Sequence, residues 1–276
     1  MIVEGKWIFL WTRVRFSPAP FFMGLIIINM NNIISFFSEN SIYLLTILCI
    51  GIFVGYLFGS IPVGYLYCKF HNVNILEFGS GNPGSTNVGR ALGKKHGRVV
   101  FILDILKIIL PVLIVNIVFN LKFLNNFFTK TLVSDELNRQ SLIKFFYQYI
   151  TTYTGLGGIL GHNYPLYLHF KGGKGVSCTM GTVFCISPLY SIILFLVYKI
   201  TTKITKYVSV GSLTAVTALF ISSIVFTFLN IYPYNYLNNE IYGILLLPGI
   251  FLMWALSIFR HKSNIIRLIN GTENKI

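Results

Sequence analysis

Long apolar runs alternate with short polar segments along most of the chain. A helix needs about 20 apolar residues to cross the hydrocarbon core of a bilayer, and the alternating pattern of a membrane barrel is absent. Because a helix satisfies its own backbone hydrogen bonds in lipid, the pattern predicts an all-α integral membrane protein. The apolar runs cover residues 42–62, 99–121, 145–160, 176–200, 208–229 and 241–259.

The run at residues 176–200 decides the number of spans. As one span it gives six in total, and the basic C-terminal tail then lies on the opposite side from the polar segments upstream. A reversal at Ser187 and Pro188 gives seven spans and brings these segments to one face. It leaves residues 230–240, which contain no Lys or Arg, on the other face. The positive-inside rule therefore favours about seven transmembrane helices, some short or broken, with the polar loops on the cytoplasmic face.

Composition agrees with lipid as the main solvent. Hydrophobic residues make up 54% of the 276 residues and charged residues only 11%, and the mean hydropathy is +0.70. A soluble domain carries about 25% charged residues. The net charge of +14 suits either orientation of the spans or binding of anionic lipids and substrates. The four cysteines show neither CxxC spacing nor a disulfide framework.

The first 22 residues differ from the rest of the chain. They hold two of the three tryptophans and two span-breaking prolines, and they lack the apolar core and cleavage site of a signal peptide. We interpret residues 1–22 as an atypical extension from an over-long reading frame, with Met23 or Met30 as the true start. N-terminal mass spectrometry of the native protein tests this, and a peptide containing Trp7 would refute it. We expect a single polytopic domain over residues 41–273.

The first polar segment, residues 71–98, contains the run GSGNPGSTNVGR. Its GxGxxG pattern does not indicate a dinucleotide site, because a membrane span precedes it in place of a βαβ unit. Glycines still allow backbone N–H groups to approach an oxyanion closely, and Arg90 adds a fork of donors that suits phosphate. The alternative is a loop of ordinary turn residues. The candidate binding residues here are Gly79, Ser80, Gly81, Asn82, Gly84, Thr86, Asn87 and Arg90.

The second polar segment contains GHNYP at residues 161–165 and FKGGKGV at residues 170–176. Gly172 and Gly173 precede Lys174 just before a new apolar run. Backbone amides and a helix N-terminus can therefore face an anion, with Lys174 as the cation. The alternative role for a lysine here, which fits Lys171 better, is to mark the membrane border.

The third polar segment begins RHKSNIIR at Arg260. If the last helix continues, His261 and Asn264 share a face, and Arg267 repeats the spacing. The alternative is a simple basic end to the final span. At the start of the sixth span, Ser212 either faces the same site or bonds its own helix backbone.

Two charged residues, Asp104 and Lys107, lie inside the second span, where charges are expected to pair. Their i, i+3 spacing favours a structural ion pair over a catalytic role. The chain shows no Ser-His-Asp set at catalytic spacing, no Cys-His pair and no HxxxxD motif. Loops rich in glycine and cations on one face of a lipid-embedded protein indicate an anionic substrate that meets an apolar one.

Together these motifs resemble the bacterial acyl-phosphate:glycerol-3-phosphate acyltransferases, over nearly the whole chain from about Ser41 to Glu273. The resemblance implies seven helices, a site at the cytoplasmic face of the inner membrane, and no metal, nucleotide or nucleic acid. It implies transfer of a fatty acyl group from acyl-phosphate to the sn-1 hydroxyl of glycerol-3-phosphate, which gives lysophosphatidic acid and phosphate. An acyl-carrier-protein-dependent phosphate acyltransferase would supply the donor.

The resemblance also implies residue roles. Ser80 and the glycine loop around it would hold the acyl-phosphate. The glycerol-3-phosphate would be gathered by Arg90, Lys174, His261, Asn264 and Ser212, with Gly172, Gly173 and Arg267 beside them. A substrate phosphate oxygen, in place of a side-chain base, would take the hydroxyl proton.

Two other functions compete with this one. A transporter of phosphate esters would present broken helices to an anion at the midplane, and it would show an inverted repeat that the sequence lacks. A non-catalytic protein that binds anionic lipid would need positive charge, but it would not need the ordered GSGN and GGKG motifs.

Overall fold

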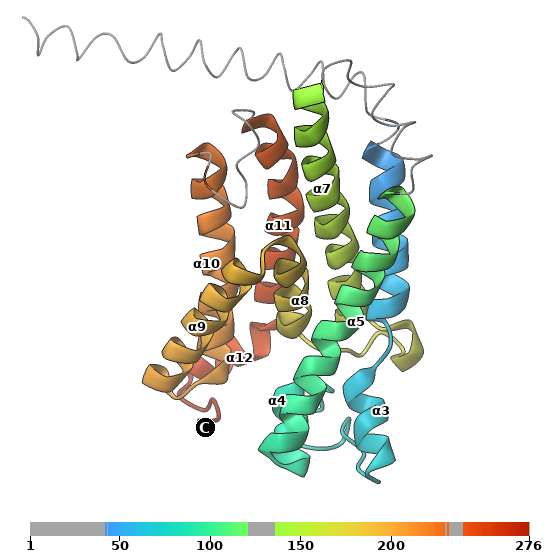
Figure 1. The fold of residues 1–276 in the computed structure, drawn as a ribbon. Helices are drawn as coiled ribbons and strands as arrows, with labels where there is room; N and C mark the ends of the chain where they lie inside the picture. The colour runs from blue at the N-terminus through green and yellow to red at the C-terminus, as the bar shows by residue number, and fades with distance from the viewer. Residues whose placement is uncertain (1–41, 43, 121–135, 230, 232–239, 276) are drawn as a thin grey trace, which may run out of the picture. The chain divides into compact units, whose positions relative to one another are not determined.

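The computed structural model describes residue 42 and residues 44–120, 136–229, 231 and 240–275. Residues from Leu45 onward form one compact unit. Its described residues form helices and connecting segments, without any strand, so the predicted all-α class is confirmed (Figure 1). The two start sites predicted at Met23 and Met30 lie outside the described residues.

Several helices are long and apolar enough to cross a membrane. Pro62 divides the first of these segments into a helix over residues 44–59 and α3 (Val63–Phe70), because proline has no N–H to continue the hydrogen-bond ladder. Large apolar side chains are exposed along these segments, as expected where the solvent is lipid. Among the described residues the qualifying segments are Leu44–Phe70, Lys94–Phe119, Val208–Phe228 and Gly243–Arg260. The count of seven spans stays a prediction.

The helix over residues 44–59 packs closely against α7 (Glu136–Asn163) through small residues. A Cβ atom on Gly55 would lie 2.0 Å from the Thr154 carbonyl oxygen, and one on Gly59 would lie 2.1 Å from that of Gly158. Small residues four apart allow two helix backbones to approach in this way. The predicted apolar run begins only at residue 145, but α7 already begins at Glu136. Hydropathy marks the part of a helix that lies in lipid and misses its polar extension.

The apolar run at residues 176–200 is two helices, α8 (Val176–Ile186) and α9 (Pro188–Thr205). Ser187 caps α9, since its Oγ accepts a hydrogen bond of 3.2 Å from the Tyr190 N–H, and Pro188 occupies the first turn. The two helices pack against each other, so the predicted reversal is confirmed. With 11 residues, α8 is about 16 Å long, roughly half of the hydrocarbon core.

The polar segments are more helical than expected. Figure 1 shows α4 and α12 at the same end of the unit, where α5 and α10 begin and α11 ends. A small buried core holds α3, α4 and the start of α5 together, formed by Cys68, Ile75, Val88 and Val100. The bounds of these helices are Ser85–Leu92 for α4, Lys94–Asn120 for α5, Val208–Phe228 for α10, Glu240–Arg260 for α11 and Lys262–Ile269 for α12.

Candidate active site

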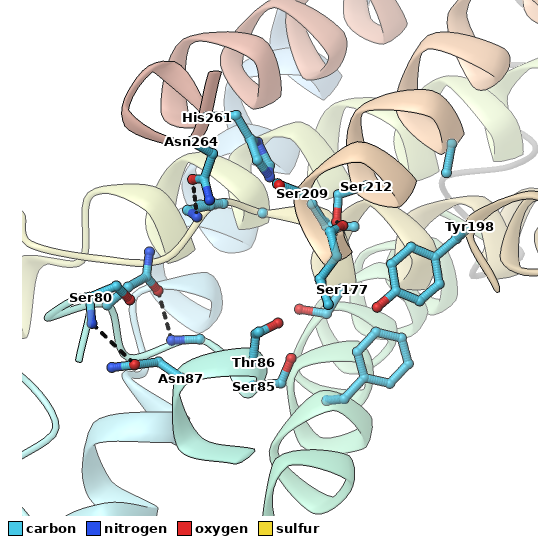
Figure 2. Close-up of a pocket in the computed structure, with 18 of the residues that line it drawn as sticks. Ser80, Ser85, Thr86, Asn87, Ser177, Tyr198, Ser209, Ser212, His261 and Asn264 are labelled. Carbon is cyan, nitrogen blue, oxygen red and sulfur yellow. Dashed lines mark hydrogen bonds between the residues drawn. The ribbon is translucent and has the colours of Figure 1, made fainter. Parts of the chain in front are cut away.

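One pocket brings the three polar segments together (Figure 2). Most of the residues singled out in the sequence line it, although they come from positions far apart in the chain. The glycines Gly79, Gly81, Gly172 and Gly173 belong to the same loops but are not among the residues that line the pocket. The predicted residues that line the pocket are Ser80, Asn82, Gly84, Thr86, Asn87, Arg90, Lys174, Ser212, His261, Asn264 and Arg267.

Three helices begin at this pocket. Ser85 of α4, Val176 of α8 and Val208 of α10 are first residues of their helices, and all three line the pocket. The first turn of a helix has N–H groups without intrahelical partners and carries a partial positive charge, so its N-terminus favours an anion. Ser212 bonds its own helix, donating to the Val208 carbonyl at 3.0 Å, which leaves its oxygen lone pairs as acceptors.

Asn87 supports the GSGN loop from behind. Its side chain is 2% exposed, its Oδ1 accepts a hydrogen bond of 3.2 Å from the Ser80 N–H, and its Nδ2 donates to the Phe78 carbonyl at 2.8 Å. Gly79 has φ of +58°, and a Cβ there would lie 2.5 Å from the Asn87 Oδ1. The loop therefore requires glycine at this position. Both ends of the Asn87 side-chain amide are hydrogen-bonded to the loop backbone.

Arg260 holds the GGKG loop, a role that sequence analysis did not assign. Its Nε donates to the Gly173 carbonyl at 3.0 Å and its Nη2 to the Gly172 carbonyl at 2.7 Å, while its guanidinium lies over the Tyr164 ring. On the other side, the Gly173 N–H donates to the His162 carbonyl at 2.9 Å. A Cβ on Gly173 would lie 1.9 Å from His162 Nε2, so only glycine fits between these partners.

Glu273, in the C-terminal tail, connects the cationic residues of the pocket. Its Oε1 accepts hydrogen bonds from Ser209 Oγ at 2.9 Å and Asn264 Nδ2 at 2.7 Å, and its Oε2 accepts from Arg267 Nε at 2.7 Å. The other end of the Asn264 amide accepts a hydrogen bond from Lys174 Nζ. The Glu273 side chain is only 5% exposed, so it fixes both the orientation of Asn264 and the place of Lys174. The sequence signal was its position in the third segment, but it was not selected as a site residue.

Burial and charge shift the titration of three groups here. Burial lowers the pKa of Lys174 to about 8, with Arg267 and Arg90 adding to the shift and Glu273 opposing it. Burial and the charge of Lys174 lower the pKa of His261 to about 4, so its ring is neutral near pH 7. Burial raises the pKa of Glu273, but hydrogen bonds from Asn264, Arg267 and Ser209 outweigh this effect, and the pKa is lowered.

The tautomer of His261 follows from its contact with the backbone. Its Nδ1 lies 2.7 Å from the Ser257 carbonyl oxygen. Since a carbonyl only accepts, Nδ1 carries the proton. Nε2 is then the acceptor of this neutral ring, which lines the pocket.

The other end of the pocket is apolar. Phe101 and Phe195 face each other there, with ring centroids 6.1 Å apart, and Met180, Tyr198 and Ala215 complete it. Figure 2 places Ser80 and Tyr198 on opposite sides of the pocket. The site therefore suits an amphiphile with an anionic head and an apolar chain.

A buried cluster behind the pocket resembles a metal site in composition but is an ion-pair network. Asp104, His162 and Cys178 place possible ligand atoms within 4.8 Å of one another. Lys107 Nζ, however, lies 3.0 Å from Asp104 Oδ1 and 3.0 Å from His162 Nδ1. The Lys107 ammonium thus lies beside the atoms that would have to bind a metal ion. The ion pair between Asp104 and Lys107 predicted from the i, i+3 spacing is confirmed.

Comparison with known proteins identifies the family. Residues 48–271 match the family model described as glycerol-3-phosphate acyltransferase. The chain belongs to this family. A glycerol-3-phosphate acyltransferase of Aquifex aeolicus is 38% identical over 220 residues, which cover 80% of this chain and 94% of the relative. One from Thermoanaerobacter sp. is 35% identical over 224 residues, with 81% and 92% covered.

Solved structures agree with the family assignment. The crystal structure of PlsY (YgiH), an integral membrane glycerol 3-phosphate acyltransferase, in its glycerol 3-phosphate form superposes with a TM-score of 0.62 at 35% identity. The superposition covers 84% of this chain and 96% of the PlsY chain. The lysophosphatidic acid form of the same protein superposes with a TM-score of 0.59 at 34% identity. The match covers 83% of this chain and 95% of the PlsY chain. The chain is therefore an acyltransferase of lipid biosynthesis and a multi-pass membrane protein.

Proposed function

We propose that this enzyme transfers a fatty acyl group from acyl-phosphate to the sn-1 hydroxyl of glycerol-3-phosphate, giving lysophosphatidic acid and inorganic phosphate. The observation that carries the proposal is one pocket whose lining combines three helix N-termini, the cations Arg90, Lys174 and Arg267, and a group of aromatic side chains. The solved relatives, crystallised in glycerol 3-phosphate and lysophosphatidic acid forms, support the acceptor and the product.

The residues divide between the two substrates. Ser80 and the loop of Gly79, Gly81, Asn82 and Gly84 would hold the acyl-phosphate, together with Thr86 at the start of α4. Asn87 would support that loop. The acceptor phosphate would lie against Arg90, Lys174 and Arg267, with Gly172 and Gly173 shaping the loop that presents Lys174. His261 Nε2, Asn264 and Ser212 offer polar atoms for the glycerol hydroxyls.

The reaction balances without a side-chain base. The sn-1 oxygen forms a bond to the acyl carbon, the bond from that carbon to the phosphate oxygen breaks, and a phosphate oxygen takes the hydroxyl proton. Inorganic phosphate leaves with the bonding pair. Because the donor is already activated, orientation and stabilisation of negative charge supply most of the rate.

The setting of the reaction follows from the same proposal. We infer one polytopic acyltransferase domain over residues 41–273, in a bacterial cytoplasmic (inner) membrane with the site on its cytoplasmic face. An acyl-carrier-protein-dependent phosphate acyltransferase would supply the acyl-phosphate. The hypothesis that residues 1–22 are an over-long reading frame stands as proposed.

The test is phosphate release by the purified protein in lipid, given palmitoyl-phosphate with and without glycerol-3-phosphate. We expect release only when the acceptor is present, with lysophosphatidic acid formed in equal amount. No release from folded protein would overturn the proposal, and uptake of labelled glycerol-3-phosphate into vesicles would then test the transporter.

Two variants and one control examine the assigned residues. Arg90→Ala and Lys174→Ala should each lose most turnover while the protein still inserts in the membrane. Lys171→Ala, three positions from Lys174 but exposed and outside the pocket lining, should keep it. Wild-type turnover in either pocket variant would remove that residue from the site.

A further inference from the structure

A second concave surface, unrelated to the pocket, lies between α3 and α5. It is lined by Val63, Leu66 and Tyr67 of α3 and by apolar side chains of α5, and Lys107 also belongs to the lining. Its volume of about 630 Å³ falls within the roughly 300–1,000 Å³ of small-molecule sites. It shares no lining residue with the pocket that holds Arg90 and Lys174.

The α5 side of this groove is a continuous apolar stripe. Leu103, Leu106, Leu110 and Leu113 are spaced by three or four residues, so they share one face of the helix. Phe101, which lines the active-site pocket, is two positions from Leu103 and points away from that face. From Leu103 to Leu113 the stripe is about 15 Å long, half of the roughly 30 Å hydrocarbon core. Its length thus matches one leaflet.

The end of the groove toward α4 is polar. Tyr67, which lines the groove, bonds His96 through its hydroxyl, which lies 3.0 Å from Nδ1. The His71 ring stacks on Tyr67 at 4.7 Å and meets His96 edge to face at 5.0 Å. His96 is seven residues before Leu103, and so lies two helical turns from it on the same face.

Several basic residues lie close in sequence to this polar end. Lys95 is seven residues before Ile102 and fourteen before the groove residue Ile109, which places it near the same stripe. Lys69 and Lys94 are exposed nearby in sequence, at the end of α3 and the start of α5. Between Val63 and Arg98, Glu77 is the one acidic residue. An apolar groove of one-leaflet length that ends in aromatic hydroxyl, imidazole and ammonium groups has the chemistry of a lipid site with a phosphate at its head.

We propose that the groove between α3 and α5 binds an anionic phospholipid, with an acyl chain along the stripe and its phosphate at Lys95 and His96. The site is separate from the reaction. The bound lipid fills the space between α3 and α5, the two helices that join the α4 segment to the rest of the fold.

Native mass spectrometry of the full chain in mild detergent tests this, with phosphatidylglycerol and phosphatidylcholine of identical acyl chains as probes. Wild type should retain phosphatidylglycerol in preference to phosphatidylcholine. Leu110→Trp, which fills the stripe, should abolish the retention, while Ile192→Trp, an exposed α9 position outside the groove, should not. Lys95→Glu should weaken the preference on the order of tenfold, and Lys171→Glu should leave it unchanged. Acyl transfer by Leu110→Trp should equal that of wild type.

Three results would overturn the proposal. Equal retention of the two lipids by wild type would show that the groove does not select an anionic head group. Undiminished retention by Leu110→Trp would place the lipid elsewhere on the surface. Displacement of the bound lipid by palmitoyl-phosphate, in wild type but not in Leu110→Trp, would assign the groove to the acyl donor.

Discussion

Lys107 and His162 meet in the buried interior, where the ammonium Nζ lies 3.0 Å from the imidazole Nδ1. An ammonium has three N–H donors. Lys107 directs the other two to the Ile61 carbonyl oxygen and to Asp104 Oδ1, each at 3.0 Å. All three protons therefore have acceptors, and His162 keeps its own proton on Nε2, the nitrogen nearest to Gly173. The network joins α5 to the end of α7 behind the GGKG loop.

Replacing Lys107 by Met should destabilise the protein strongly, because it leaves the Asp104 carboxylate buried without its cation. Removal of one partner from a buried ion pair costs about 3–5 kcal/mol. The measurement is the unfolding transition in detergent. Asp104→Asn combined with Lys107→Met should recover part of the loss. A single Lys107→Met variant as stable as wild type would show that the pair does not support the fold.

Gly173→Ala should lower kcat/KM by about 100-fold, since the new Cβ would displace the GGKG loop from His162 and move Lys174. Gly89→Ala is the matched control, because the nearest atom to a Cβ there, the Gly97 Cα, is 3.6 Å away. Both variants should insert in the membrane to the same extent. Equal kinetics in the two variants would contradict a steric role for Gly173.

The pKa of Lys174 predicts an alkaline limit to activity. Burial lowers it to about 8, so above that pH the lysine loses the charge that we propose binds the acceptor phosphate. A profile of kcat/KM for glycerol-3-phosphate from about pH 6 to pH 10 reports groups of the free enzyme. Wild type should decline above about pH 8. Lys174→Arg, whose guanidinium stays charged, should lack this decline even if its maximal rate is lower, and an identical decline in both would assign it to another group.

The lowered pKa of Lys174 also makes the free energy of unfolding increase with pH over a defined interval. Unfolded lysine titrates near 10.4, above the folded value of about 8, so the folded protein releases this proton first. The cost of burying the charged form is complete below pH 8 and disappears as pH rises toward about 10.4. Wild type should therefore gain stability relative to Lys174→Met across that interval, and unfolding midpoints of both proteins measure it. A constant difference would show that Lys174 titrates as in the unfolded chain.

The sequence was informative where local chemistry dictates structure. The reversal predicted at Ser187 and Pro188 is the break between α8 and α9, because a proline suits only the first turn of a new helix. The motif residues were recognised because glycines and cations close together in sequence are typical of phosphate-binding loops. Hydropathy, however, located neither the start of α7 nor the helix α4, since both lie in polar sequence.

The residues that were missed act through tertiary contacts. Arg260 reaches Gly172 across 88 positions, and Glu273 reaches Ser209 across 64. Arg260 looks like an ordinary basic residue at the end of a span, and for Glu273 only its position in the third polar segment pointed to the site, so neither contact could be predicted. The Tyr67 and His96 contact is likewise set by the packing of α3 on α5.

The apolar end of the pocket gives a prediction that separates donor from acceptor. Phe101 of α5 and Phe195 of α9 both line the pocket, with ring centroids 6.1 Å apart. Phe101→Ala removes one of these rings and with it contacts to the acyl chain, so KM for palmitoyl-phosphate should rise about tenfold. KM for glycerol-3-phosphate should stay unchanged, because its proposed partners are the cationic and polar residues of the pocket. Phe228→Ala, at an exposed α10 position outside the pocket, is the control. A rise in both KM values for Phe101→Ala would mean that the ring supports the whole site and does not line the path of the acyl chain.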